Sequence, residues 1–162
     1  MILVALGSNR AGPWGSPGET VGKALLALGR DGLKLEGASR LIVSSPFGRQ
    51  NQPPFVNAVA EIATHLEPGA LMKKLHGIER SAGRRREVRW GPRTLDLDLL
   101  DYHGLVQNDP ESVILPHPGI AERIFVLKPI AELAPSWVHP VLGQSAAMLL
   151  GRLDQAGEGA EI

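Results

Sequence analysis

The feature that most constrains the fold is the alternating run Leu-Asp-Leu-Asp-Leu at positions 95–99. Successive side chains of a β-strand point to opposite faces, so the run predicts a strand with Leu95, Leu97 and Leu99 on a buried face. Asp96 and Asp98 then share the other face, where neighbouring carboxylates repel each other. An ordinary solvated strand face is the alternative. A hard cation such as Mg²⁺ would offset the repulsion, because it takes oxygen ligands and needs few carboxylates.

A dense arginine cluster precedes this run. Six of the 17 basic residues fall between Arg80 and Arg93, and all six are arginine. Arginine forms bidentate contacts with phosphate, although a charge run is otherwise typical of a solvated loop. The patch around Trp90 would also suit nucleic acid, but only 4% of the residues are aromatic and no RNP-type aromatic strand is present. Carboxylates beside arginines therefore favour nucleotide phosphate chemistry with a small polyphosphate as ligand.

The composition is that of an ordinary globular protein, and we expect one domain over residues 1–162. The net charge is zero, so the molecule as a whole is not a polyanion binder. The absence of cysteine excludes disulfides, thiolate catalysis and Cys-based zinc sites. No apolar run reaches the length that spans a bilayer, and the N-terminus lacks the basic start of a signal peptide. We therefore expect a cytoplasmic protein without membrane contact, and a monomer because nothing marks an interface.

Hydrophobic periodicity predicts an alternation of strands and helices. The expected elements, in order, are a strand at 2–6, a helix with a capping box at Ser16 and Glu19, a strand at 33–45, a strand from Phe55 to Thr64, a helix from Pro68 to Gly83 and the strand with Asp96 and Asp98. This β-α-β-β-α-β order predicts an α+β fold with a ferredoxin-like core and both helices on one sheet face. The C-terminal third, residues 105–162, is expected to add loops and short helices that wall the other face, with a frayed tail at 154–162.

The predicted open face carries polar and aromatic side chains. Phe55 and Asn57 lie opposite the apolar side of their strand, as Asp96 and Asp98 do on theirs. We interpret this face as the floor of an active site. The segment 18–23 does not fit a P-loop, because its glycines have the wrong spacing and alanine follows the lysine. A lone histidine in a loop is more often structural than catalytic, and His117 is kept as a candidate only because histidine is versatile.

Residues 83–98 read Gly-Arg-Arg-Arg-Glu-Val-Arg-Trp-Gly-Pro-Arg-Thr-Leu-Asp-Leu-Asp. This segment closely resembles the signature of the 6-hydroxymethyl-7,8-dihydropterin pyrophosphokinase family. The resemblance also covers Leu-Gly-Ser-Asn at 6–9, Gln-Pro-Pro-Phe-Val-Asn-Ala at 52–58 and Leu-Pro-His-Pro at 115–118. It implies transfer of the pyrophosphoryl group of ATP to the pterin hydroxymethyl group with release of AMP, in folate biosynthesis. We expect no second fused enzyme within these residues.

The resemblance also implies roles for individual residues. Catalytic roles fall on Arg84, Arg86, Asp96 and Asp98, and the two aspartates hold two Mg²⁺ ions. ATP contacts fall on Glu79, Arg89, Trp90, Arg93, Leu99, His117 and Arg123. Pterin contacts fall on Ser44, Phe47, Phe55, Asn57 and Phe125. Phe55 stands where family members often carry tyrosine, Ser44-Ser45 stands where some carry Thr-Pro, and the role of Arg85 stays open.

Two other hypotheses remain at this point. A ferredoxin-like nucleic-acid-binding module would use the arginines of 84–93 and would not need Asp96 or Asp98. A nucleotide sensor would bind ATP without turnover. No strong general base is evident near the signature, so metal activation of the hydroxyl is the expected mechanism. Asp101 lies beyond the signature on the leucine side of the alternation, and we interpret it as a surface charge.

Overall fold

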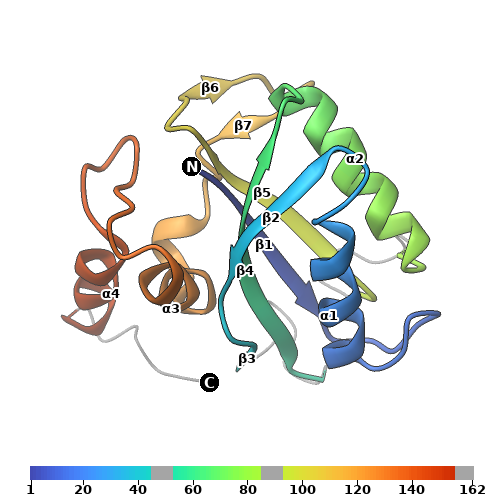
Figure 1. Cartoon of the computed structure of the whole chain (residues 1–162). Coiled ribbons are helices and arrows are strands. Elements are labelled where there is room, and N and C mark those ends of the chain that lie inside the picture. The colour runs from blue at the N-terminus through green and yellow to red at the C-terminus, as the bar shows by residue number, and fades with distance from the viewer. Residues whose placement is uncertain (45–52, 85–92, 156–162) are drawn as a thin grey trace.

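The computed structural model describes residues 1–44, 53–84 and 93–155 (Figure 1). Its main sheet is antiparallel and has the strand order β2-β4-β1-β5, with β3 pairing to β4. The strands are β1 (Ile2–Ser8), β2 (Leu33–Ala38), β3 (Ile42–Ser44), β4 (Phe55–Thr64) and β5 (Asp96–Tyr102). A small second sheet pairs β6 (Gln107–Asn108) with β7 (Ile114–Leu115). The predicted α+β class and the split β-α-β order are confirmed.

Helices α1 (Pro17–Ala27) and α2 (Pro68–Ser81) cover one face of the sheet (Figure 1). The predicted capping box starts α1: Glu19 N donates to Ser16 Oγ, and Ser16 N donates to Glu19 Oε1. Both helices pack on the inward side chains of the strands. The buried members of this core are Ile2, Val4, Leu6, Val21, Ala24, Leu28, Leu33, Ala58, Ala60, Ile62, Leu71, Leu75, Ala82, Leu95, Leu97, Leu99, Val113 and Leu115. The strand alternation at 95–99 therefore buries its leucines as predicted.

The opposite face is partly covered by the C-terminal third. The 3-10 helix η1 (Ile120–Glu122) leads into α3 (Ile124–Leu133), and α4 (Ala146–Gln155) packs against α3 (Figure 1). A second core forms there from buried residues of strands and helices, namely Leu3, Val59, Leu100, Ile120, Val126, Leu127, Ile130, Ala134, Trp137, Ala146 and Leu149. The wall predicted for residues 105–162 is present over the described part, and α4 extends to residue 155 rather than fraying at 154. Helices in the described segments are all too short or too polar to cross a membrane.

The single strand predicted at 33–45 is wrong, because two strands occupy it. Strand β2 pairs with the far half of β4, with Ala38 opposite Ala60, and β3 begins with Ile42 opposite Asn57. Between them the chain leaves the ladder toward α3, where Arg40 N and Nε donate to the carboxylate of Glu132. At the break Val59 N of β4 donates to the Ser39 side chain instead of a backbone carbonyl, a contact that periodicity does not reveal.

The surface role predicted for Asp101 is also wrong. The pairing of β1 with β5 shifts so that Val4 faces Leu99 and Leu3 faces Asp101, which leaves Leu100 as an extra residue. Such a bulge reverses the alternation beyond it. Asp101 therefore points into the second core, where it is 3% exposed and accepts a hydrogen bond of 2.8 Å from Trp137 Nε1.

Candidate active site

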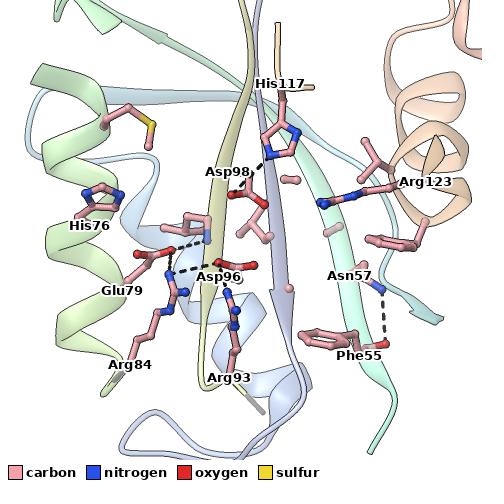
Figure 2. A pocket seen from close by; sticks show the side chains of 18 residues that line it. Phe55, Asn57, His76, Glu79, Arg84, Arg93, Asp96, Asp98, His117 and Arg123 are labelled. Atoms are coloured by element: carbon pink, nitrogen blue, oxygen red, sulfur yellow. Dashed lines mark hydrogen bonds and ion pairs between the residues drawn. The ribbon is translucent and has the colours of Figure 1, made fainter. Parts of the chain in front are cut away.

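A cavity of about 270 Å³ opens on the sheet face away from α1, over strands β5, β1 and β4, and α2 flanks it beyond the edge strand β5 (Figure 2). The middle strand contributes Ala5 and Gly7 to its lining, the two smallest side chains available. Gly7 pairs with Asp96 on one side and with Asn57 on the other. A Cβ atom at Gly7 would lie 3.2 Å from Asn57 Oδ1, which is a close contact. The cavity therefore exists because the strand between its two walls carries almost no side chain.

Asp96 and Asp98 project from β5 into this cavity (Figure 2). Their side chains are 27% and 33% exposed, so both carboxylates reach the cavity. Burial, and secondarily the neighbouring Asp96 carboxylate, raises the pKa of Asp98 to about 7. Burial and the second carboxylate thus outweigh the nearby guanidinium groups of Arg123 and Arg84, which lower the pKa of Asp98.

This carboxylate pair fits a magnesium ion by its chemistry. Within the described ranges, no three His, Cys, Asp or Glu side chains gather into a metal cluster. Mg²⁺ is often held by one or two carboxylates, because it keeps water and substrate phosphate oxygens as its other ligands. Asp96 and Asp98 supply that donor set, whereas a cation that needs a full protein cage would find too few ligands here.

Basic side chains neutralise Asp96 on the side facing α2. Arg84 Nη1 lies 2.9 Å from Glu79 Oε2 and 3.2 Å from Asp96 Oδ1, and Arg93 Nη1 lies 3.6 Å from the same Asp96 oxygen (Figure 2). Glu79 is 3% exposed, and its Oε2 also accepts a bond of 2.7 Å from Leu97 N. Burial raises the pKa of Glu79, although these bonds oppose the increase. Glu79 thus anchors α2 to β5 and orients the Arg84 guanidinium toward Asp96.

The far side of the carboxylate pair is bounded by His117 and Arg123. His117 N donates to Leu100 O, the carbonyl of the bulged residue, over 2.9 Å. His117 Nδ1 accepts from Gly119 N at 3.0 Å, and its Nε2 lies 4.0 Å from Asp98 Oδ1 (Figure 2). Burial and the Arg123 guanidinium lower the pKa of His117 to about 4. The imidazole is therefore neutral at neutral pH and presents an N–H toward the cavity.

The opposite end of the cavity is aromatic. Phe55 from β4 and Phe125 from α3 line it, together with the amide of Asn57 (Figure 2). Asn57 is 5% exposed, and its Nδ2 donates to Ser44 Oγ over 2.6 Å. Ser44 is not part of the lining but fixes the Asn57 amide from behind. One end of the cavity thus suits a flat polar ring, and the other suits a charged phosphate chain.

A family model for 7,8-dihydro-6-hydroxymethylpterin-pyrophosphokinase (HPPK) matches residues 3–135. The chain belongs to the HPPK family. It is 44% identical over 135 residues to the 2-amino-4-hydroxy-6-hydroxymethyldihydropteridine pyrophosphokinase of Pseudomonas aeruginosa, covering 83% of this chain and 80% of that protein. With the enzyme of the same name from Haemophilus influenzae it shares 42% identity over 139 residues, 85% of this chain and 83% of the relative.

Longer HPPK relatives also match. The folic acid synthesis protein fol1 of Pneumocystis carinii is 38% identical over 146 residues, but these cover 90% of this chain and only 19% of that protein. A crystal structure of wild-type Plasmodium falciparum HPPK-DHPS superposes with a TM-score of 0.68 at 12% identity, over 97% of this chain and 46% of that one. At this identity the superposition supports the fold alone.

The cavity gathers most of the residues that the HPPK resemblance singles out. The members found in its lining are Phe55, Asn57, Glu79, Arg84, Arg93, Asp96, Asp98, His117, Arg123 and Phe125. Leu99 does not join them, because its side chain is 2% exposed in the core beneath α1 and α2. Phe47, Arg86, Arg89 and Trp90 lie outside the described residues, as does Arg85.

Several residues that line the cavity were not predicted from the sequence. His76 and Met72 face the cavity from α2, one and two turns before Glu79 (Figure 2). Both residues lie on the same face of α2 as Glu79, because their spacing follows the helical period. They could therefore have been predicted from the position of Glu79. Ala5 and Gly7 were missed because a small side chain carries no chemistry of its own.

Proposed function

We propose that this chain transfers the pyrophosphoryl group of ATP to 6-hydroxymethyl-7,8-dihydropterin, giving AMP and the pterin diphosphate, in folate biosynthesis. The observation that carries the proposal is one cavity with a carboxylate pair and arginines at one end and two phenylalanines with a buried amide at the other. Membership of the HPPK family agrees with a cavity that has one charged end and one aromatic end.

We assign the charged end to the triphosphate of ATP. Asp96 and Asp98 would hold Mg²⁺, and we propose two ions as in the resemblance. When bound, the metal supplies neutralising charge and a lower pKa for a coordinated hydroxyl. Arg84, Arg93 and Arg123 would contact phosphate oxygens, since guanidinium groups suit bidentate phosphate contacts. The ion pairs that Arg84 and Arg93 now form with Asp96 hold both guanidinium groups at the cavity wall until phosphate replaces the carboxylate.

We assign the aromatic end to the pterin. Phe55 and Phe125 would enclose the flat ring, and Asn57, held by Ser44, would hydrogen-bond its edge. The hydroxymethyl oxygen would then attack the β-phosphorus. The bond between that phosphorus and the oxygen bridging to the α-phosphate breaks, AMP leaves, and the hydroxyl proton passes to solvent.

The described side chains offer positioning rather than a strong base. Glu79 is engaged by Arg84 and Leu97 N, and His117 has a pKa near 4. Asp98, with a pKa of about 7, is the group we assign to Mg²⁺. Phosphoryl-type transfer depends mainly on alignment and on neutralised charge, so a strong base is not required. We also propose, from the sequence, that the enzyme acts as a monomeric, cytoplasmic, single-domain protein without a nucleic-acid or membrane partner.

A nucleotide assay tests the function. The protein is incubated with ATP, Mg²⁺ and the hydroxymethyl-dihydropterin, and the nucleotides are separated by ion-exchange chromatography. AMP should accumulate with the pterin and not without it. ADP as the product would contradict pyrophosphoryl transfer, and bound ATP without turnover would indicate a sensor instead.

A further inference from the structure

Asn9 follows β1 directly and is buried, with 2% of its surface exposed. Its side chain bonds to backbone on two sides: Nδ2 donates to Pro53 O over 3.0 Å, and Oδ1 accepts from Arg93 N over 2.8 Å. Asn9 N also donates to Arg93 O at 3.0 Å. One amide therefore connects two segments that lie forty residues apart in the chain.

These two segments lead to opposite ends of the cavity. Pro53 lies two residues before Phe55, the first residue of β4 and part of the aromatic end. Arg93 lies three residues before Asp96, with which its guanidinium pairs at 3.6 Å. Strands β4 and β5 do not pair with each other, because β1 lies between them. Asn9, at the end of β1, is thus placed to fix the approach to one strand against the approach to the other.

The chemistry of the site requires an amide side chain. The Pro53 carbonyl needs a donor and the Arg93 N–H needs an acceptor, and asparagine carries both. Aspartate would keep the acceptor and lose the donor, whereas alanine would lose both. Because Asn9 is buried, a backbone group that loses its bond to Asn9 does not gain a bond to bulk water in its place. Each lost bond therefore costs free energy.

We infer that Asn9 is a positioning residue that couples pterin binding to ATP binding. The inference rests on the proposed function, because it takes Phe55 as the pterin side and Arg93 as the phosphate side. A ligand that restrains Arg93 would also restrain Pro53 through the hydrogen bonds of Asn9. Binding of either ligand would therefore favour binding of the other. Such coupling is reciprocal, and displacements near 1 Å at a reacting centre are costly in rate.

The experiment measures binding without turnover, by titration calorimetry with Mg²⁺, α,β-methylene-ATP and 6-hydroxymethylpterin. In the wild-type protein each ligand should tighten the other by about tenfold. Asn9→Ala should reduce this factor to about twofold or less while changing the affinity for each ligand alone by less than about threefold. Steady-state assays of the same variant should show a fall in kcat of about tenfold with smaller changes in KM.

Asn9→Asp divides the two contacts. It keeps an acceptor for Arg93 N and removes the donor to Pro53 O, so it should lose coupling as Asn9→Ala does. The control is Ser39→Ala, since Ser39 is also buried and bonds to backbone twice, to Val59 N and Arg40 O, away from the cavity. It should lower the melting temperature and leave the coupling factor unchanged.

Two outcomes would overturn the inference. Wild-type coupling in Asn9→Asp would show that the Pro53 contact has no part in it. Equal effects of Asn9→Ala and Ser39→Ala on coupling, matched to their loss of stability, would reduce Asn9 to a structural role. The calorimetric result is independent of turnover, so failure of wild-type protein to form AMP would refute the proposed function separately.

Discussion

Strand β5 carries three aspartates in two contrasting environments. Asp101 lies in the second core and accepts bonds from Trp137 Nε1 at 2.8 Å and from Gly104 N at 2.9 Å. Asp98, three residues earlier, faces the cavity beside Asp96, and its pKa is raised to about 7. The same side chain thus stabilises the fold where neutral donors surround it, whereas its charged form is disfavoured where burial and a second carboxylate outweigh the nearby arginines.

The largest expected effect separates the two environments by activity. Asp96→Asn and Asp98→Asn keep the side-chain shape and remove the charge that would hold Mg²⁺, so the rate of AMP formation should fall by at least about a thousandfold. Asp101→Asn is the matched control. It keeps only one of the two acceptor oxygens that serve Gly104 N and Trp137 Nε1, but it lies outside the cavity lining, so the rate should stay within about twofold of wild type. Rates within tenfold of wild type for Asp98→Asn would refute the ligand role.

The next effect concerns stability. Asp101→Leu leaves the indole N–H of Trp137 without its acceptor in a buried site and removes the acceptor of the Gly104 N–H, which lies in an exposed turn. The free energy of unfolding, measured by urea denaturation, should fall by about 2–3 kcal/mol. The kcat of the folded variant at 25 °C should stay unchanged. A large loss of kcat at full folding would mean that the bulge transmits its geometry to Asp98.

A smaller effect follows from the pKa of Asp98, which lies near 7 in the folded protein against an ordinary 3.8. The folded state favours the neutral acid, so ionisation costs stability as pH rises between about 4 and 7, and the contribution is constant above that range. Without Mg²⁺, Asp98→Asn should remove this decline in the free energy of unfolding. The variant should then be more stable than wild type at pH 7.5 by about 1 kcal/mol. This figure allows for solvent screening, because the Asp98 side chain is 33% exposed. Parallel pH profiles of the two proteins would contradict it.

The smallest effect tests Gly7 of β1, the strand that lies between the aromatic and the charged end of the cavity. Gly7→Ala places a methyl group 3.2 Å from Asn57 Oδ1, which must shift by a few tenths of an ångström. The KM for the pterin should rise by about threefold, with the KM for ATP unchanged. Gly22→Ala, which meets no atom within 4 Å, is the control. An equal rise in both KM values would mean that the substitution also disturbs Asp96.

Much of the fold could be predicted because its signals are local. The capping box at Ser16, the alternation at 95–99 and the apolar face of β4 each depend on neighbouring residues, and the structure confirms all three. The cavity follows from the same alternation, since Phe55, Asn57, Asp96 and Asp98 lie on one face of the two strands that flank β1.

The errors have long-range causes. Asp101 was misplaced because a bulge depends on the pairing of β1 with β5, not on the sequence of β5 alone. The strand predicted at 33–45 breaks where Val59 N, 20 residues away in the chain, donates to the Ser39 side chain. Leu99 stays a prediction of the resemblance, and its side chain lies in the core as the alternation with Asp98 predicts.

Strand β1 supplies alternate side chains to both cores, with Ile2, Val4 and Leu6 on one face and Leu3 on the other. It also pairs with strands on both edges. Neither core can separate from the sheet without exposing the strand that the other core needs, so the two layers should melt together rather than in turn. The amide hydrogens of β1 should therefore be the last to exchange with solvent deuterium, and their exchange should report the opening of the whole molecule.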